Sequence, residues 1–255
     1  MDRSQLKRFW DGKARRYPLP FQPKTYQGTL GILEMIKQRG VSFREKTVLD
    51  LGCGTGVFTL PLAQEASFVL GIDCSEEMIG LLKNEAEKYG IKNVGTRNAF
   101  WQDLDPEVTG LRKAFDIGFA AMTAAVKSKE DVLKLEDCSR EWVVYVGWGR
   151  KRENSLMREI FALHGLELKS PGGSMMVGST LQELGRDFQF EFLESSWDWE
   201  GTVDEALEDL SGFIQMEGRV PQRERILQIL QEGIVDGKIR HTTFVEQGLV
   251  IWKPK

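Results

Sequence analysis

Cysteine and histidine are scarce in this chain of 255 residues. The three cysteines, Cys53, Cys74 and Cys138, are an odd number without a Cys-x-x-Cys pair, and neither His164 nor His241 lies at metal-ligand spacing from them. This excludes a disulfide framework and a zinc-type cluster. We therefore expect reduced thiols and no metal site.

The sequence also lacks long apolar runs and an excess of positive charge. No stretch of about 18 uncharged apolar residues, enough to span a bilayer, occurs, and no apolar run follows Met1-Asp2-Arg3-Ser4. The net charge is −4, from 34 basic and 38 acidic residues spread along the chain. Because nucleic acids and anionic membranes are bound through basic patches, we expect neither as a partner. The expected reduced thiols and the lack of an apolar run after the first residues predict a cytoplasmic location.

A chain of this length with 41% hydrophobic residues can bury a sizeable core, and α/β folds of this size are commonly one domain. Between residues 47 and 148, short apolar runs alternate with helical patterns, which is typical of a parallel sheet covered by helices. The clearest helix runs from Glu76 to Tyr89. The predicted strands cover Thr47 to Leu51, Phe68 to Asp73, Val94 to Asn98, Phe115 to Ala121 and Trp142 to Trp148.

Further elements are predicted on both sides of this alternating region. Ahead of it, helices over Ser4 to Arg15 and Thr25 to Gln38 are expected to form a lid. Behind it we expect a helix over Asn154 to His164, a turn at Pro171-Gly172-Gly173, a strand over Gln189 to Trp197, a capped helix from Thr202 to Met216, Pro221 in the first turn of another helix, and a strand over Thr242 to Trp252. The expected single domain thus comprises lid helices (1–40), a core (41–150) and cap elements with closing strands (151–255).

An apolar strand runs directly into a glycine-rich turn between Val48 and Gly56. Gly52, Gly54 and Gly56 are spaced Gly-x-Gly-x-Gly, and a helix is predicted to begin near Val57. Glycine is required where a ligand approaches the main chain closely or where φ is positive, because a Cβ would interfere with both. Since position 57 is valine, the Gly-x-Gly-x-x-Gly fingerprint of NAD-binding proteins is not met.

An acidic residue, Asp73, ends the second predicted strand. It follows the glycines by roughly twenty residues, where a carboxylate can accept hydrogen bonds from both hydroxyls of a ribose. Strand-to-helix turns without a ligand also use glycine, so the turn alone is weak evidence. Asp50 before the glycines and Asp73 after the next strand together favour a nucleoside site.

The segment Leu49-Asp50-Leu51-Gly52-Cys53-Gly54-Thr55-Gly56 resembles the first motif of the class I S-adenosylmethionine-dependent methyltransferases. The resemblance extends to Gly71-Ile72-Asp73, to Phe115-Asp116-Ile117 and to the lid-like Phe9-Trp10-Asp11 with Ala14 and Tyr17. It implies a Rossmann-like α/β sheet, mostly parallel with an antiparallel end, plus N-terminal lid helices and a C-terminal helical insertion. It also implies S-adenosylmethionine as the cofactor and S-adenosylhomocysteine as the product.

In this family, Asp50 and the glycines would surround the methionine part of the cofactor, and Asp73 would hold the ribose. The residues that the resemblance places at the cofactor are Asp50, Gly52, Cys53, Gly54, Thr55, Gly56, Asp73, Cys74, Met78, Asn98, Ala99, Phe100, Trp101, Ala120 and Tyr17.

The third strand departs from the commonest pattern of this family, in which it ends in an Asp-Ala pair. Here the strand ends in Asn98-Ala99-Phe100-Trp101. The amide oxygen of Asn98 or the carboxylate of Asp103 could accept a hydrogen bond from the adenine amine, and Phe100 or Trp101 could stack on the ring. Both aromatic residues could equally be core residues at a strand end.

The acceptor side of the site carries fewer signals. The fourth strand runs into small and apolar residues, which favour an acceptor recognised by shape, and Met122 and Thr123 could either face it or pack in the core. Trp148, between two glycines at the end of the fifth strand, is the main candidate for an aromatic contact with the substrate, and Trp10 of the lid is another. Arg150 is interpreted as a solvated charge, and both histidines as structural.

These features predict methyl transfer to an unidentified small molecule. A sulfonium is a good leaving group, so positioning can supply roughly 7–11 kcal/mol without acid, base or metal, and no catalytic residue is marked. The Asn/Asp-Pro-Pro-aromatic and Pro-Cys motifs of DNA methyltransferases are absent. Three alternatives remain: use of another carbon of the cofactor, a cofactor-binding sensor or scaffold subunit without activity, and a protein or RNA methyltransferase.

Overall fold

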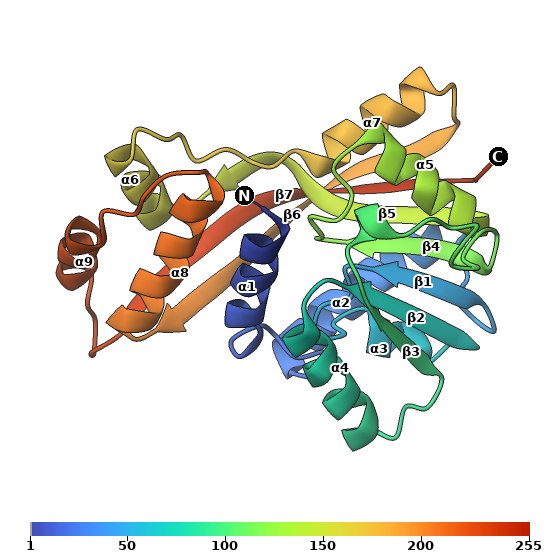
Figure 1. Cartoon of the computed structure of the whole chain (residues 1–255), viewed down its shortest axis with the longest axis horizontal. Coiled ribbons are helices and arrows are strands. Elements are labelled where there is room, and N and C mark those ends of the chain that lie inside the picture. The colour runs from blue at the N-terminus through green and yellow to red at the C-terminus, as the bar shows by residue number, and fades with distance from the viewer. Residues whose placement is uncertain (1) are drawn as a thin grey trace. The chain divides into compact units, whose positions relative to one another are not determined.

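The structure is a computed structural model that describes residues 2–255; Met1, the first residue of the expected lid, lies outside the described residues. Helices and strands alternate along much of the chain (Figure 1). The elements are α1 (Arg3–Ala14), α2 (Pro23–Gln38), β1 (Thr47–Leu51), α3 (Thr59–Ala63), β2 (Phe68–Asp73), α4 (Glu76–Lys88), β3 (Val94–Asn98), the 3₁₀ turn η1 (Trp101–Asp103), β4 (Phe115–Ala121), α5 (Lys129–Cys138), β5 (Ser139–Glu153), α6 (Ser155–Leu163), α7 (Gly173–Glu183), β6 (Phe188–Gly201), α8 (Val203–Met216), α9 (Arg223–Glu232) and β7 (Ile239–Trp252).

The strands form one seven-stranded sheet in the order β3-β2-β1-β4-β5-β7-β6. The pairs from β3 to β5 are all parallel, and the last strands give the antiparallel end. In this register Leu51 pairs with Ile72 and with Ala120, and Asp73 pairs with Asn98. The carboxyl ends of β1, β2, β3 and β4 therefore meet along one edge, where open α/β sheets bind their ligands. This confirms the predicted fold class.

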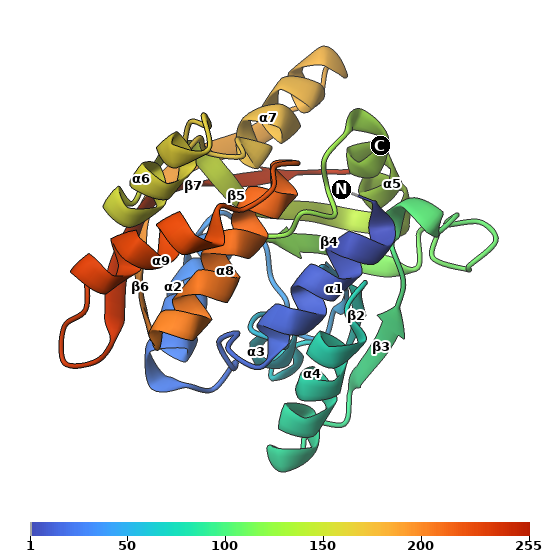
Figure 2. The ribbon, with the colours of Figure 1, turned by 60° about the vertical axis from the view of Figure 1, so that its left-hand side comes forward.

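Packing divides the chain into two compact units, and β5, β6 and β7 contribute residues to both. The glycine-turn unit comprises residues 10–147, 173–191 and 248–255 and contains β1 to β4. The helical unit comprises the described residues 2–9 together with 148–172 and 192–247, and it contains α6, α8 and α9 (Figure 2). The expected division into lid, core and cap stays a prediction.

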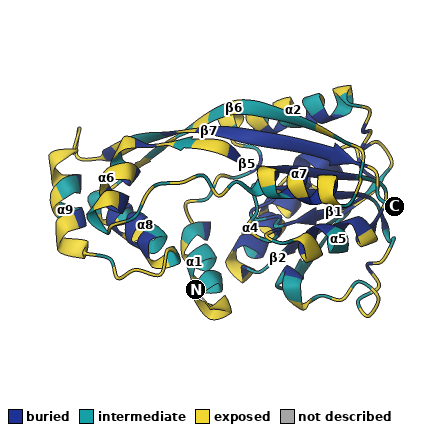
Figure 3. Ribbon diagram, turned by 90° about the horizontal axis from the view of Figure 1, so that it is seen from above, coloured by how far each residue is buried: buried dark blue, intermediate teal, exposed yellow. Residues whose placement is uncertain are grey.

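The core of the glycine-turn unit is built around its central strands. Val48, Leu49 and Leu51 of β1 are fully buried, because β1 has a strand on each side and helices pack over the sheet. Strands buried in this way have nearly continuous apolar sequences, as this one does. Figure 3 shows the same pattern, with the central strands mostly dark blue, β6 mainly teal and the outer faces of the helices yellow.

The helical unit has a separate apolar core. Its buried residues are Met157, Ile160, Phe161, Ala206, Leu207, Leu210, Ile214, Ile226, Leu230 and Ile239. Side-chain caps position the helices: Asn154 accepts from the amide of Met157 at the start of α6, and Thr202 and Glu205 form a capping box at the start of α8. Such caps satisfy amides that have no partner within the helix.

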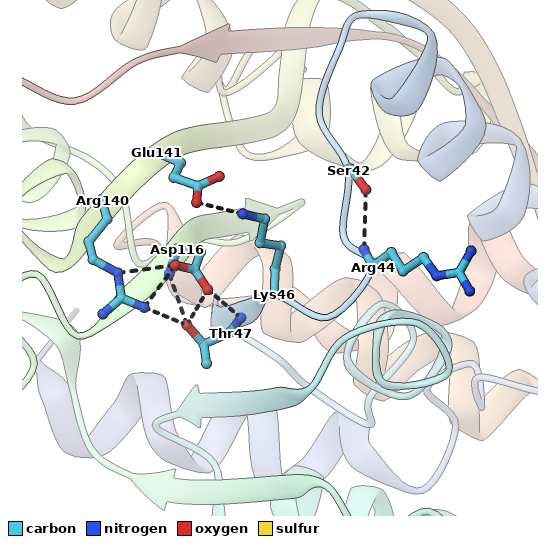
Figure 4. Close-up of polar contacts among 7 residues, drawn as sticks. All are labelled: Ser42, Arg44, Lys46, Thr47, Asp116, Arg140 and Glu141. Carbon is cyan, nitrogen blue, oxygen red and sulfur yellow. Dashed lines mark hydrogen bonds and ion pairs between the residues drawn. The ribbon is translucent and has the colours of Figure 1, made fainter.

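A polar network joins the amino ends of β1, β4 and β5 (Figure 4). The Asp116 carboxylate accepts from the amide of Thr47 at 2.8 Å and from Arg140 Nη2 at 2.8 Å, and Lys46 pairs with Glu141. Burial alone would raise the pKa of Asp116, but the bonds from Thr47 and Arg140 outweigh it and hold that pKa below its usual value. The network lies at the opposite end of the strands from the glycine turn, which indicates a role in stability.

Four predicted strands, β1 to β4, have the bounds that the sequence indicates. The prediction for β5 was too short: the strand continues to Glu153, so Trp148 lies within it and not at its end. Helix α7 was missed, because Gly172 and Gly173 predicted only a turn, whereas Gly173 begins the helix. Two helix starts were also misplaced: α3 begins at Thr59, and Pro221 precedes the cap of α9.

No helix formed by the described residues is long and apolar enough to cross a membrane.

Candidate functional site: a glycine turn and an acidic strand end

The turn after β1 has the backbone conformation that its glycines predict. Gly52, Gly54 and Gly56 have φ values of 72°, 52° and 91°, in the left-handed region that glycine alone adopts at little cost. A Cβ on Gly52 would lie 2.0 Å from Thr123 Oγ1, so at this position glycine is also required by packing against the loop after β4. At Gly54 the nearest atom to such a Cβ, at 3.8 Å, is on the Tyr17 ring. Gly54 is partly exposed, and the Tyr17 ring lies beside it.

Asp73, at the carboxyl end of β2, faces this turn. Its Oδ2 accepts from the amide of Gly54 at 2.9 Å, and its Oδ1 accepts from the amide of Ser75 at 2.8 Å. A carboxylate offers about four lone-pair positions, and the amide of Cys74 also interacts with Asp73, so only part of its acceptor capacity is left for another donor. Burial raises the pKa of Asp73, and the amides of Ser75 and Gly54 partly oppose that effect.

Ser75 joins Asp73 to the N-terminal segment. Its Oγ caps α4 by accepting from the amide of Met78 at 3.2 Å, and it donates to Asp11 Oδ1 at 2.6 Å. The helix cap is thus Ser75, and Asp73 fixes the peptide in front of it. The Asp11–Ser75 bond was not predicted from the sequence, because 64 residues separate the two partners.

The N-terminal segment of the glycine-turn unit lies against the glycine turn itself. Tyr17 approaches Gly54, its ring is edge-on to Trp10 at 6.3 Å, and Thr55 Oγ1 donates to the carbonyl of Pro18 at 2.6 Å. Burial and the charge of Asp73 raise the pKa of Tyr17. Residues 10–20 therefore lie beside the glycine turn and Thr55 holds this segment there, while its role as a lid stays a prediction.

Asp50 is buried at the end of β1, with 2% of its surface exposed. Its Oδ2 accepts from Thr59 Oγ1 at 2.5 Å. Burial raises the pKa of Asp50 to about 7, the hydrogen bond from Thr59 opposes the rise, and the charge of Asp73 adds to it. A charge change beside the glycine turn is therefore available near neutral pH.

At the end of β3, the residues proposed to contact the adenine differ in how far they are exposed. Asn98 is exposed, and its Nδ2 donates to the carbonyl of Asp73 at 3.0 Å. The acceptor atom of the amide, Oδ1, takes no part in that bond. Trp101 has only 2% of its surface exposed, belongs to the main apolar cluster and donates to the carbonyl of Asp131 at 3.4 Å. Of the two roles considered for Trp101, adenine stacking and core packing, the structure shows core packing. Phe100 and Ala99 are partly exposed, and Asp103 is exposed.

Several other residues predicted at the cofactor have buried side chains. Cys53 packs with Leu60, Ile79 and Leu82, so only its backbone borders the turn. Met78 is buried in α4, and Ala120 lies in the core of the sheet. Cys74 is partly exposed and directly follows Asp73. For Cys53, Met78 and Ala120 the role that the structure shows is packing.

The loop after β4 is held tightly against the glycine turn. Met122 has a φ of 49°, unusual for a residue with a Cβ, and its amide donates to the carbonyl of Val146 at 2.7 Å. Thr123 contacts Gly52, and its Oγ1 accepts from the amide of Ala125 at 3.0 Å. Non-glycine residues in this strained conformation cluster at functional sites. Met122 and Thr123 therefore border the same strand ends as Asp50 and Asp73.

Trp148 and Arg150 belong to the helical unit. The prediction that Trp148 lies at a strand end was wrong, because β5 continues to Glu153. The Trp148 ring packs edge-on against Trp197, with ring centres 5.5 Å apart. Arg150 is exposed, in agreement with a solvated charge, and its guanidinium and amide also donate to the carboxylate of Glu246.

The two histidines make structural contacts. His164 caps α6, with Nδ1 2.7 Å from the carbonyl of Ile160 and Nε2 accepting from the amide of Gln222 at 2.9 Å. His241 stacks on Trp199 at 5.2 Å and lies 2.8 Å from Asn154 Nδ2. In addition, no group of three or more His, Cys, Asp or Glu residues among 2–255 is arranged to hold a metal ion.

The family described as "Methyltransferase domain" matches residues 42–233, more than half of the chain. The chain therefore belongs to the methyltransferase domain family, and the predicted enzyme class is confirmed. Its fold is that of the class I methyltransferases, a class whose cofactor is S-adenosylmethionine.

Among curated proteins, an uncharacterized protein of Haemophilus influenzae is 31% identical over 127 residues, which cover 49% of this chain and 44% of that protein. The 23S rRNA (uracil(1939)-C(5))-methyltransferase RlmD of Aeromonas hydrophila is 36% identical over 108 residues, 40% of this chain and 23% of that enzyme. The matched segments thus span less than half the length of these relatives.

A solved structure with the same fold is the magnesium protoporphyrin IX methyltransferase of Synechocystis PCC 6803, crystallised with bound SAH. Its TM-score is 0.56 at 16% identity, and the alignment covers 76% of this chain and 93% of that one. At this identity the likeness concerns the fold alone.

Proposed function

We propose that this protein binds S-adenosylmethionine at the Gly52–Gly56 turn and transfers its methyl group to a small molecule. The observation that carries the proposal is the position of Asp73, with its carboxylate hydrogen-bonded to the amide of Gly54 and with acceptor capacity left for a ribose. The turn suits a close-approaching ligand, since its three glycines have positive φ and Gly54 is partly exposed. The end of β3, with Asn98 and Phe100, would border the adenine.

The residues at these strand ends suit a reaction driven by positioning. When bound, the cofactor supplies a methyl group on a sulfonium, which needs no further activation as a leaving group. Asp73, together with Asp50 in its ionised form, brings negative charge to the turn, which favours a cationic cofactor over its neutral thioether product. The loop at Met122 and Thr123 is placed to orient an acceptor, and positioning is the main source of rate enhancement in such reactions.

Two features favour a small acceptor over RNA. The chain has a net charge of −4, whereas RNA-binding surfaces carry clustered lysine and arginine. The match to the rRNA methyltransferase covers only 23% of that enzyme. The fold is shared with an enzyme whose name specifies a porphyrin as acceptor, which agrees with a small molecule without identifying it.

Cofactor binding is tested first, by calorimetric titration with S-adenosylmethionine, S-adenosylhomocysteine and NAD. We expect the first two to bind and NAD to bind far more weakly, because Val57 replaces the third glycine of the dinucleotide fingerprint. Equal affinity for NAD would contradict the proposal.

The acceptor class is tested with methyl-labelled S-adenosylmethionine. The protein is incubated separately with the metabolite, RNA and protein fractions of a cell extract, with the Asp73→Ala variant as a control for label transferred by other enzymes. We expect label in the metabolite fraction only, as a product heavier by one methylene. Label in RNA or protein would replace the small-molecule assignment, and binding without transfer in any fraction would indicate a sensor or scaffold.

A further inference from the structure

Arg152 occupies an unusual environment in the helical unit. It lies on β5, and its guanidinium is 4.9 Å from the centre of the Trp148 ring and 5.5 Å from that of Phe213. Nη2 is 3.4 Å from the sulfur of Met157. The side chain is therefore surrounded on several sides by aromatic rings and a thioether, which contact its faces but satisfy few of its five N–H donors.

The charge of Arg152 has no counter-ion among the described residues. Its Nε is buried without a hydrogen-bond partner, and no carboxylate of residues 2–255 forms an ion pair with it. Burial lowers the pKa of Arg152, and the more distant charge of Glu217 partly opposes that effect. Arginine nevertheless stays protonated in proteins, so a cation is held here with unused donors.

Two other arginines, Arg186 and Arg150, are paired with carboxylates. Arg186, with 13% of its side chain exposed, donates through Nε and Nη2 to the carboxylate of Glu136, and Arg150 does the same with Glu246. Leaving a buried charge unpaired is costly, so natural chains usually supply a carboxylate or a ligand. At Arg152 the described residues supply aromatic rings but no carboxylate.

We propose that Arg152 binds the anionic group, a carboxylate or a phosphate, of a small ligand whose apolar part packs against Trp148. A guanidinium donates to either group through two parallel hydrogen bonds, and an aromatic neighbour suits a flat or apolar ligand body. The site lies within the helical unit and is independent of the proposed function. The sequence alone could not indicate it, because the fifth strand was expected to end at Trp148.

The test uses benzoate, phenyl phosphate and neutral benzamide as probes at constant ionic strength, followed by calorimetry and thermal melting. We expect at least one anion to bind and stabilise the wild-type protein, and benzamide to do neither. Arg152→Met should weaken anion binding by at least about tenfold, because it removes charge-assisted hydrogen bonds. Arg152→Lys should lie between the two, since it keeps the charge without the planar donor pair.

Arg158→Met is the matched control, since it makes the same change in charge at an exposed position of α6. It should bind the anions as the wild type does. The unliganded Arg152→Met protein should melt at the same temperature or higher, because an apolar side chain replaces a buried unpaired charge. A merely structural arginine would behave in the opposite way, with a lower melting temperature and unchanged anion binding.

The proposal is overturned if neither anion binds the wild type, if benzamide binds as well as benzoate, or if Arg152→Met binds the anions with unchanged affinity. If Arg152→Met does not fold, Arg152→Lys decides by the same comparison. S-adenosylmethionine is titrated in parallel. A wild-type protein that binds the anions but not S-adenosylmethionine contradicts the proposed function and leaves the anion site standing, whereas the reverse pattern rejects the anion site alone.

Discussion

Replacing Asp73 by alanine should affect cofactor binding and folding to different extents, and the structure allows the two effects to be separated. The carboxylate accepts from the amides of Gly54 and Ser75 in the free protein. In the complex it would also accept from two ribose hydroxyls. Charge-assisted hydrogen bonds are worth about 1.5–3 kcal/mol each, and water replaces part of this when the acceptor is removed. We expect cofactor binding to weaken by roughly 2–3 kcal/mol, or about 30- to 150-fold.

The same variant should also be less stable, because it leaves two amides without their acceptor. Loss of such bonds costs about 1–3 kcal/mol for each group that stays buried. Ser75→Ala is the control for this effect: it removes the cap of α4 and the bond to Asp11 but leaves the carboxylate of Asp73 in place. Loss of the cap should cost about 1 kcal/mol of stability, with cofactor affinity nearly unchanged.

The assay is calorimetric titration with S-adenosylmethionine at a temperature where both variants are fully folded, together with thermal melting without ligand. The reasoning is refuted if Asp73→Ala melts at a lower temperature yet binds the cofactor with wild-type affinity. It is also refuted if Ser75→Ala loses as much affinity as Asp73→Ala, since the effect would then come from the shape of the turn and not from the carboxylate.

Three further predictions concern the turn and the pH dependence of stability. Gly52→Ala should unfold or strongly destabilise the protein, because its Cβ would meet Thr123. Gly54→Ala should cost only about 1–2 kcal/mol of stability and mainly weaken cofactor binding. Equal melting temperatures of the two variants would contradict this prediction. Asp50 has a raised pKa of about 7, so the stability that its neutral form contributes is lost as the pH rises through about 7. The melting temperature of Asp50→Asn should therefore depend less on pH in that range. Asp116 has a lowered pKa, so its contribution is present at neutral pH and lost in acid, and Asp116→Asn should reduce the acid sensitivity of melting; a steeper acid loss would contradict it.

Local sequence patterns were sufficient for β1 to β4 and for the cap of α8. These features depend on neighbouring residues: an apolar run followed by glycines, or a polar side chain three positions before a helical amide. The glycine turn belongs to the same group, because a positive φ is a requirement of one residue and its nearest neighbours. For that reason the cofactor side of the candidate site could be located from the sequence.

The remaining features depend on contacts between distant residues. Whether β5 ends at Trp148 or continues to Glu153 depends on its pairing within the sheet, and no local signal marks the difference. Trp101 is buried because α5, some thirty residues later, packs over it, so the alternative of adenine stacking could not be excluded beforehand. The sequence determined the conformation of the glycine turn at which we propose that the cofactor binds, because glycine geometry is local. Only the tertiary structure decided which charges are paired, because an arginine such as Arg152 has a counter-ion only if folding brings a carboxylate to it.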